Sequence, residues 1–448
     1  MSEWKKVKIG EFLTEREGRY KPNDKIVAQY QRLDKIDFSG TIHVSNKPTK
    51  TDMILVQPGD LVISGINVAK GAVAVYQGDT PVCATIHYSA YTFNPSIVDL
   101  DYFKYFVKSP AFLEVLKQQV KGGIITELKP KDLLPLEISV PDLQEQKRIV
   151  SDLSAELNQI ELLSAEIASQ KSYIKQLRAN ILQDAIEGKL TADWREKHPI
   201  IKGDPDYDAE ALFEKIQEER EKNNKRNVRS SNNLQDKMED DFKIEIPTNW
   251  KFVKLSQLGT LERGRSKHRP RNDKCLFVGG KYPFVQTGDV SQSKYYGYKI
   301  QQASKFYNET GLAQSKMWKA GTLCITIAAN IAETGFLTYD ACFPDSVVGF
   351  TSYITGYFST FVRYYINSIK QILEKYAPAT AQKNINLGIL ETLKIPLPPL
   401  AEQIEIVRVV EAKLQIALEL EKQISERENL TNMLMQGILK ETFEESNK

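Results

Sequence analysis

The sequence contains only four cysteines among its 448 residues, Cys83, Cys275, Cys324 and Cys342. Their wide separation includes no Cys-x-x-Cys pair, so it indicates neither a zinc ribbon nor a redox dithiol, and reduced thiols are the simplest interpretation. No run of 18 apolar residues occurs, and the first 20 residues lack the apolar core of a signal peptide. We therefore expect a cytoplasmic protein without membrane spans.

An excess of one charge is also missing. Sixty Lys and Arg residues oppose 58 Asp and Glu residues, which leaves a net charge of +2. Bulk charge therefore does not indicate a nucleic-acid binder, and any such function must depend on local clusters. Hydrophobic residues at 41% are typical of a globular chain, and 448 residues predict two or three folding units.

Catalytic motifs are absent as well. The chain has no Asn/Asp-Pro-Pro-aromatic loop for holding a flipped base, no glycine-rich cofactor turn and no phosphate-binding loop of the G-x-x-x-x-G-K-[ST] type. The nearest approach, the stretch from Asp204 to Tyr207, has an acidic third position. The histidines show no metal-ligand spacing; they are His43, His87, His198 and His268. We expect no catalytic centre, no bound cofactor and no metal in this chain.

The chain is instead an internal repeat. The segment from Pro141 recurs from Pro398 at an offset of 257, and 14 of 47 aligned positions are identical where chance predicts about three. Similarity at shifted offsets extends outwards, since Trp4 matches Trp250 and Gly18-Arg19 matches Gly264-Arg265. The order is globular unit, long helix, connector, globular unit, long helix.

Both repeated segments have the three-four apolar spacing of a helical seam. The residues that we expect at the interface of the helices or at a partner are Glu145, Gln146, Ile149, Leu153, Leu157, Ile167, Leu177 and Ile181 in the first segment, and Glu402, Gln403, Ile406, Val410, Leu414, Ile424, Leu434 and Ile438 in the second. A rod of 44 residues is about 66 Å long. Such a stripe needs a partner, and the other copy is the simplest one.

If a two-fold axis relates the halves, the helices run antiparallel. The alternative is that each helix packs only on its own globular unit. Short β-branched runs and helical patterns in each unit, among them 102–120 and 358–376, predict mixed α and β structure. A polar connector with a short amphipathic helix at 207–225 separates the halves.

At these residues the chain resembles the specificity subunit of type I restriction-modification systems. The resemblance depends on the doubled Pro-x-Leu-x-Glu-Gln motif at Pro141 and Pro398, on the helix exit from Ile181 to Leu190, and on the stretch Trp194-Arg195 with His198-Pro199. It covers essentially the whole chain. One departure is that the second helix exit lacks Gly-Lys-Leu.

The resemblance implies a non-catalytic subunit that reads a bipartite, asymmetric double-stranded DNA site. It also implies two docked copies of an adenine-N6 methyltransferase, which binds S-adenosylmethionine, and a restriction and translocase subunit, which uses ATP and Mg. The predicted parts are target-recognition domain 1 (1–140), a central spacer helix (141–190), the connector (191–247), target-recognition domain 2 (248–396) and a C-terminal spacer helix (397–448). The fold class is mixed α/β (α+β), a pseudo-two-fold tandem repeat.

Three loops in each domain are candidates for DNA contact. The basic stretch 263–274 suits phosphates and guanine edges, and Asn or Gln side chains suit adenine. The candidates are Arg16, Arg19, Ser64, Asn67, Lys70, Lys121 and Thr126 in the first domain, and Arg263, Arg265, Lys267, Arg269, Arg271, Asn330, Gln382, Lys383 and Asn384 in the second. Solvated basic loops and ordinary turns are the alternative interpretation of these residues.

Two other functions stay open at this point. A coiled-coil scaffold whose paired domains bind proteins would have the same repeat and helices. A self-sufficient methyltransferase or nuclease is disfavoured by the missing motifs. The sequence does not identify the bases that are read, because these depend on loop geometry and DNA shape.

Overall fold

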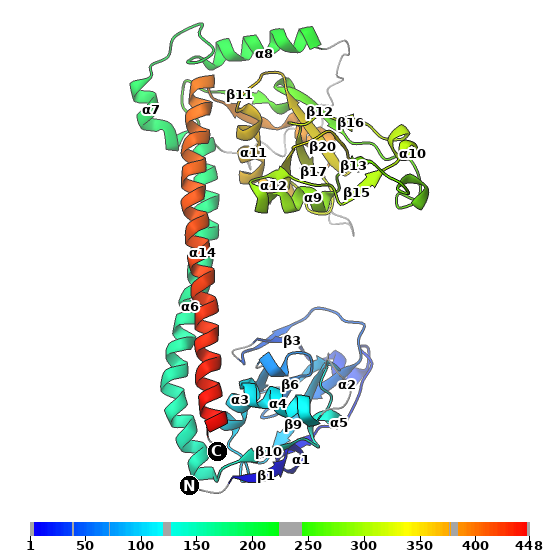
Figure 1. Cartoon of the computed structure of the whole chain (residues 1–448), viewed down its shortest axis with the longest axis vertical. Coiled ribbons are helices and arrows are strands. Elements are labelled where there is room, and N and C mark those ends of the chain that lie inside the picture. Colours follow the sequence, from blue (N-terminus) through cyan, green and yellow to red (C-terminus); the bar gives the residue numbers. More distant parts are fainter. Residues whose placement is uncertain are drawn as a thin grey trace. The chain divides into compact units, whose positions relative to one another are not determined.

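A computed structural model of the chain describes residues 4–37, 40–70, 72–119, 127–223, 244–375, 377 and 384–445 (Figure 1). The chain divides into two units. Unit 1 comprises Met1–Lys171 and Lys422–Lys448, and unit 2 comprises Ser172–Glu421. Each unit contains one globular domain and a part of both long helices.

The globular domain of unit 1 is built from two four-stranded sheets, ordered β2-β9-β6-β7 and β4-β3-β8-β5, and a terminal pair, β1-β10. Its strands are β1 (Lys5–Lys8), β2 (Leu13–Glu15), β3 (Arg32–Ile36), β4 (Ile42–Ser45), β5 (Met53–Val56), β6 (Leu61–Ser64), β7 (Val73–Val75), β8 (Val82–Thr85), β9 (Tyr88–Phe93) and β10 (Glu137–Val140). Its helices are α1 (Ile9–Phe12), α2 (Lys25–Ala28), η1 (Val68–Lys70), α3 (Leu100–Lys108), α4 (Pro110–Gln119) and α5 (Pro130–Leu133).

The globular domain of unit 2 repeats this plan with sheets β12-β20-β17-β18-β14 and β15-β13-β19-β16 and the pair β11-β21. Its strands are β11 (Lys251–Lys254), β12 (Gly259–Arg263), β13 (Tyr282–Phe284), β14 (Lys299–Ile300), β15 (Lys305–Tyr307), β16 (Met317–Trp318), β17 (Leu323–Thr326), β18 (Thr334–Leu337), β19 (Ala341–Cys342), β20 (Val347–Ser352) and β21 (Lys394–Leu397). Its helices are η4 (Leu255–Gln257), η5 (Lys274–Leu276), α9 (Thr287–Gln292), η6 (Ser293–Tyr296), α10 (Glu309–Ala313), α11 (Phe358–Ser368), α12 (Lys370–Lys375) and α13 (Leu387–Thr392).

Two helices predicted as single elements are each divided. The pattern 102–120 forms α3 and α4, because Pro110 has no backbone N–H to continue the ladder and begins a new helix. The pattern 358–376 forms α11 and α12, which are separated at Ile369. The mixed α and β class of both domains is confirmed.

The long helices are α6 (Leu143–Ile186) and α14 (Leu400–Glu445), and the connector carries η2 (Lys189–Thr191), α7 (Ala192–Lys197) and α8 (Ala209–Asn223). Buried residues recur at every seventh position of both helices. They are Gln146, Leu153, Ile160, Ile167, Ile174 and Ile181 in α6, and Gln403, Val410, Ala417, Ile424 and Thr431 in α14. A strict seven-residue repeat is typical of a left-handed helix pair.

The two helices pack against each other in both units, and they run antiparallel (Figure 1). In unit 1, Lys171 Nζ lies 2.5 Å from Glu428, and Arg427 donates to Gln170. Each of these residues meets its own counterpart 257 positions away, as expected at a two-fold axis. In unit 2, Arg178 donates to Glu421 at 2.7 Å. The alternative that each helix packs only on its own domain is therefore wrong.

Two of the residues predicted at the helix or partner interface lie outside the buried rows, Leu177 and Leu434, which are 40% and 54% exposed. Each lies three residues after a buried position, which places it about 60° around the helix axis from that position. The fourth residue after a buried position is only about 40° away from it around the axis. Arg178 and Met435 occupy these closer positions and are half-buried. The seam in this stretch is therefore narrower than the apolar pattern indicates.

Each globular domain packs on both helices of its unit. In unit 1, the ring of Phe443 lies 5.3 Å from that of Tyr102 and 5.7 Å from that of Phe106. In unit 2, Ile186, the repeat counterpart of Phe443, belongs to the core of the second domain. The duplicated motif joins the start of each long helix to the segment before it. Gln146 donates to the Pro141 carbonyl and Gln403 to the Pro398 carbonyl, both at 2.8 Å.

The neighbouring glutamates of this motif differ sharply between the repeats. Glu402 is fully buried and accepts from Arg195 at 2.5 Å and from Thr191 and the Trp250 indole at 2.7 Å. The connector thus closes over the start of α14. Its counterpart Glu145 is partly exposed, and among the described residues it forms an ion pair only with Arg148 on its own helix.

We predict that Glu402→Ala lowers the free energy of unfolding by about 3 kcal/mol, because it leaves a largely buried guanidinium without its carboxylate. The counterpart substitution Glu145→Ala should change it by less than about 1 kcal/mol, as is usual for an exposed pair. Urea denaturation of both variants measures the difference. Equal losses for the two variants would contradict the asymmetry described for these positions.

Candidate nucleic-acid interface

Four separate segments of the first domain meet at one end of its β2-β9-β6-β7 sheet. The Gly65 amide donates to the His87 carbonyl, and the Leu128 amide donates to the Gly65 carbonyl, both at 2.9 Å. The Arg16 amide joins them by donating to Ala90 at 2.8 Å. Residues of the Arg16, His87 and Leu128 segments line a cavity of about 270 Å³. The structure thus brings together candidate loops that lie up to 112 residues apart in the sequence.

The second domain uses the same backbone frame. The Ile327 amide donates to Ser346 at 3.0 Å, the Ile385 amide donates to Ile327 at 2.9 Å, and the Gly264 amide donates to Val347 at 2.9 Å. Gly264 is required by close packing, because a Cβ atom there would lie 2.2 Å from the Phe343 carbonyl oxygen. The segments that meet here are the repeat counterparts of those in the first domain.

The side chains on the two frames are different. In the first domain, His87 and Glu127 form a pair with 2.8 Å between Nδ1 and the carboxylate. The corresponding places in the second domain hold Ser346 and Asn384, and Asn384 is exposed. One backbone arrangement therefore presents two different sets of polar groups.

The candidate residues of the first domain have mixed environments. Arg16 is engaged by Asp60, which is almost fully buried, with 2.5 Å between Nε and a carboxylate oxygen. Arg19 and Lys70 are exposed, Asn67 is half-buried and Ser64 is buried. Lys121 and Thr126 lie outside the described residues.

The basic loop of the second domain, residues 263–274, is exposed at all of its candidate positions. Arg263, Arg265 and Lys267 form no ion pair with any other described residue. Arg269 donates to the carbonyls of Ser266 and His268, and Arg271 pairs with Asp345 at 2.7 Å. Gln382 and Lys383 lie outside the described residues. The free cations of this loop are the groups best suited to contact phosphate.

The loop between β17 and β18 is held in a strained conformation. Ala329 and Ala332 both have positive φ, 64° and 60°, which is unusual for residues with a Cβ. The buried Thr326 hydroxyl accepts from the Glu333 amide at 3.0 Å and donates to the Asn330 carbonyl. Asn330 projects from this loop and donates to Ser291 at 3.2 Å.

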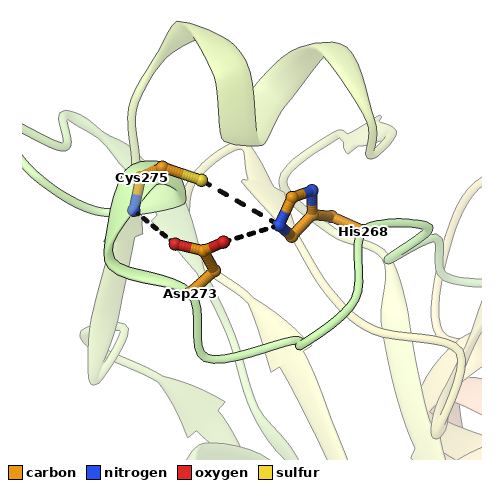
Figure 2. Close-up of side chains that lie close together, drawn as sticks. All are labelled: His268, Asp273 and Cys275. Atoms are coloured by element: carbon orange, nitrogen blue, oxygen red, sulfur yellow. Dashed lines mark hydrogen bonds and ion pairs between the residues drawn. The ribbon is translucent and has the colours of Figure 1, made fainter.

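Sequence reasoning missed one cluster in the basic loop, His268 with Asp273 and Cys275 (Figure 2). The histidines have none of the short His and Cys spacings typical of metal sites, and the pattern His-x4-Asp-x-Cys is not one of these. The Cys275 amide and His268 hydrogen-bond to Asp273 and hold its pKa at about 2. Asp273 in turn raises the pKa of the Cys275 thiol, which is therefore not activated as a nucleophile.

The predicted helix-interface residues are mostly internal to the chain. Those that are buried within it are Gln146, Ile149, Leu153, Leu157, Ile167, Ile181, Glu402, Gln403, Ile406, Val410 and Ile424. Glu145, Leu414 and Ile438 are half-buried. Of the whole set only Leu177 and Leu434 are exposed enough to meet another protein.

These features define a class of protein, a tandem chain that presents two related recognition surfaces on a pair of helices. The family described as type I restriction modification DNA specificity domain matches residues 1–170 and 247–427. The chain therefore belongs to this family, and it is a type I restriction-modification specificity subunit with two target-recognition domains. By its family it is a DNA specificity subunit and not an enzyme, which confirms the prediction from the sequence.

Curated relatives agree over most of their length. The chain is 22% identical to the EcoKI specificity subunit of Escherichia coli strain K12, over 91% of this chain and 79% of that protein. It is 23% identical to the StySPI specificity subunit of Salmonella potsdam, also over 91% and 79%. A solved chain from a study of complex assembly and conformational transition in the type I system has a TM-score of 0.56 at 17% identity, covering 98% of this chain and 97% of that one. This likeness shows the fold.

No helix within the described residues is long and apolar enough to cross a bilayer.

We predict that Thr326→Val destabilises the second domain by about 1–3 kcal/mol, because it removes a buried hydroxyl and leaves the Glu333 amide and the Asn330 carbonyl without their shared partner. Hydrogen exchange at the Glu333 amide should accelerate at the same time. Ser64→Ala, at the counterpart position, is the control. The Ser64 side chain forms no hydrogen bond with another described residue, so a loss within about 1 kcal/mol is expected. Unchanged exchange at Glu333 in Thr326→Val would contradict the proposed anchoring.

Proposed function

We propose that the chain reads a bipartite, asymmetric double-stranded DNA site, one half with residues 1–140 and the other with residues 248–396. The observation that carries this proposal is the shared backbone frame with different side chains. His87 and Glu127 in the first domain correspond to Ser346 and Asn384 in the second. Two copies of one frame with different chemistry suit two different half-sites, because base edges are distinguished by their donor and acceptor patterns.

In the second half of the site, Arg263, Arg265 and Lys267 supply exposed positive charge beside the frame. In the first half, exposed Arg19 is the counterpart of Arg265, and exposed Lys70 lies on the loop that follows β6. Arginine suits this task because its planar guanidinium can grip guanine O6 and N7 or a phosphate with two hydrogen bonds. Arg16 is the weaker candidate, since its Nε is already committed to a buried carboxylate.

Amide side chains supply the second kind of contact. Asn67, Asn330 and Asn384 lie on the loops of the two frames. An Asn side chain can pair with adenine N6 and N7 at once. The strained backbone around Asn330 supports this role, since strain of this kind often accompanies a binding loop whose conformation is fixed in advance.

We also propose that the helices dock two copies of an adenine-N6 methyltransferase subunit. Tyr173 and Leu177 are 67% and 40% exposed on α6, and their repeat counterparts Leu430 and Leu434 are 64% and 54% exposed on α14. An apolar pair one helical turn apart, present twice at equivalent positions, suits one partner that binds twice.

Chemistry then belongs to the other subunits of a cytoplasmic complex. The methyltransferase binds S-adenosylmethionine, and a restriction and translocase subunit uses ATP and Mg. The relatives named above support this assignment, because they are described as specificity subunits of type I restriction enzymes.

The decisive experiment is to co-express the chain with its methyltransferase and map N6-methyladenine across the host genome. A split motif with a fixed spacer is expected, and replacing residues 248–396 by those of a relative should change one half of it only. Methylation that is absent, or unchanged when the chain is deleted, would contradict the function.

Single substitutions sharpen this test. Arg263→Ala or Arg265→Ala should weaken DNA binding by about 1–3 kcal/mol, and loss of a phosphate contact should reduce the slope of log K against log salt by about 0.9. Lys319→Ala is the matched control, because Lys319 is an exposed cation near the other end of β17 and pairs with Asp340. Equal effects of the three substitutions would exclude a specific role for the arginines.

The docking surface has its own test. Tyr173→Ser with Leu177→Ser should reduce the bound methyltransferase from two copies to one, and so should Leu430→Ser with Leu434→Ser, because each pair removes one apolar surface. Light scattering of the purified complex measures the stoichiometry. Leu162→Ser is the control, since Leu162 is exposed but its counterpart is Glu419. If all variants still bind two copies of the methyltransferase, the docking surface is not formed by these residues.

A further inference from the structure

Three different metal-ligating groups converge on the basic loop of the second domain. Figure 2 shows the side chains of His268, Asp273 and Cys275 turned toward one another. His268 Nε2 lies 2.9 Å from Asp273 Oδ2 and 3.9 Å from Cys275 Sγ, and all three donor atoms lie within 4.8 Å of one another. Cys275 is the one exposed cysteine of the chain, whereas the other three are buried.

Both ends of this loop are held in place independently of the cluster. The His268 amide donates to the Gln314 side chain at 3.0 Å, which fixes the start of the segment. Cys275 lies in η5 next to Leu276, which is fully buried in a small core with Tyr307. The donors therefore approach one another from two anchored stretches of backbone, and little freedom is lost when a ligand joins them.

We propose that His268, Asp273 and Cys275 bind one divalent cation of the zinc class, with solvent water as the fourth ligand. Tetrahedral zinc would place its nitrogen and oxygen ligands about 3.4 Å apart and its nitrogen and sulfur ligands about 3.6 Å apart. The observed separations differ from these by a few tenths of an ångström, which side-chain rotations on an exposed loop can supply.

The donor set selects the metal. A thiolate and an imidazole suit zinc and similar transition metals, whereas magnesium and calcium prefer oxygen ligands alone. On binding, the Cys275 thiol releases its proton to solvent and forms the metal–sulfur bond. The two charges of the cation then balance the thiolate and Asp273.

The nearby arginines repel a bound metal ion only weakly, because their charges are already engaged by other groups. Arg271 is paired with Asp345, and Arg269 is directed to backbone carbonyls. Metal binding removes the net negative charge of the cluster, which leaves Lys267 and Lys274 as a more strongly positive surface. The metal would therefore fix the loop and strengthen its attraction to phosphate. This last consequence rests on the proposed function, whereas the metal site itself does not.

The test uses the full chain, stripped with a chelator and titrated with Co²⁺ and then Zn²⁺. We expect one Co²⁺ per chain, with the visible bands of tetrahedral cobalt and an ultraviolet thiolate-to-cobalt band, both lost on adding Zn²⁺. Cys275→Ser should remove the thiolate band and weaken Zn²⁺ binding by more than about tenfold. A missing thiolate band, or an unchanged Zn²⁺ affinity in Cys275→Ser, would overturn the site.

His43→Asn is the matched control. His43 and Asp37 also lie 2.9 Å apart on the surface but have no cysteine beside them, so this variant should bind Co²⁺ like the original chain. Removing Zn²⁺ should also weaken binding to DNA that contains the motif found by N6-methyladenine mapping. The loss should be about three- to tenfold in the original chain and absent in Cys275→Ser.

The two proposals fail separately. A chain that recognises its DNA motif but gives no thiolate band would overturn the metal site and leave the proposed function intact. A chain that binds Co²⁺ through Cys275 but ignores DNA would support the site and contradict the proposed function.

Discussion

The rows of side chains buried at every seventh position of α6 and α14 are the constraint on which both units depend. Each globular domain completes its core with residues from both helices, such as Phe443 in unit 1 and Ile186 in unit 2. A domain therefore cannot be separated from the helix that follows the other domain in sequence. Polar contacts between counterpart residues, Lys171 with Glu428 and Gln170 with Arg427, set the register of the pair. These exposed contacts select the register, while the buried rows supply most of the stability.

The two globular domains share their backbone hydrogen bonds and differ in the side chains of their loops. The amides of Leu128 and Ile385, exactly one repeat apart in sequence, make the same hydrogen bond to the loop beside them. Backbone bonds do not depend on side-chain identity, so the loops can exchange side chains without losing their shape. Divergence of His87 and Glu127 against Ser346 and Asn384 is the expected result. The side chains on one frame can therefore change without disturbing the backbone of the other.

Sequence periodicity predicts those features that depend on local spacing. The helices and their antiparallel pairing follow from a seven-residue repeat and from the doubling of the chain, and the structure confirms both. Leu177 fits the apolar pattern of the buried row although it is exposed, because spacing does not distinguish an apolar residue beside the seam from one inside it. The strand order was beyond the sequence, because pairing joins β2 to β9 across more than 70 residues. The cluster at His268 was missed because its ligands have no familiar spacing, and only the turn at Asp273 brings them together.

The positive charge of the chain is concentrated locally. The whole chain has a net charge of +2, yet the loop 263–274 contains six cations and one acid. Acidic residues elsewhere balance these cations in number, but charges farther away than the Debye length of about 8 Å are largely screened. A phosphate near Arg263 and Arg265 is therefore attracted by the positive charge of the loop and is little affected by the net charge of the whole chain.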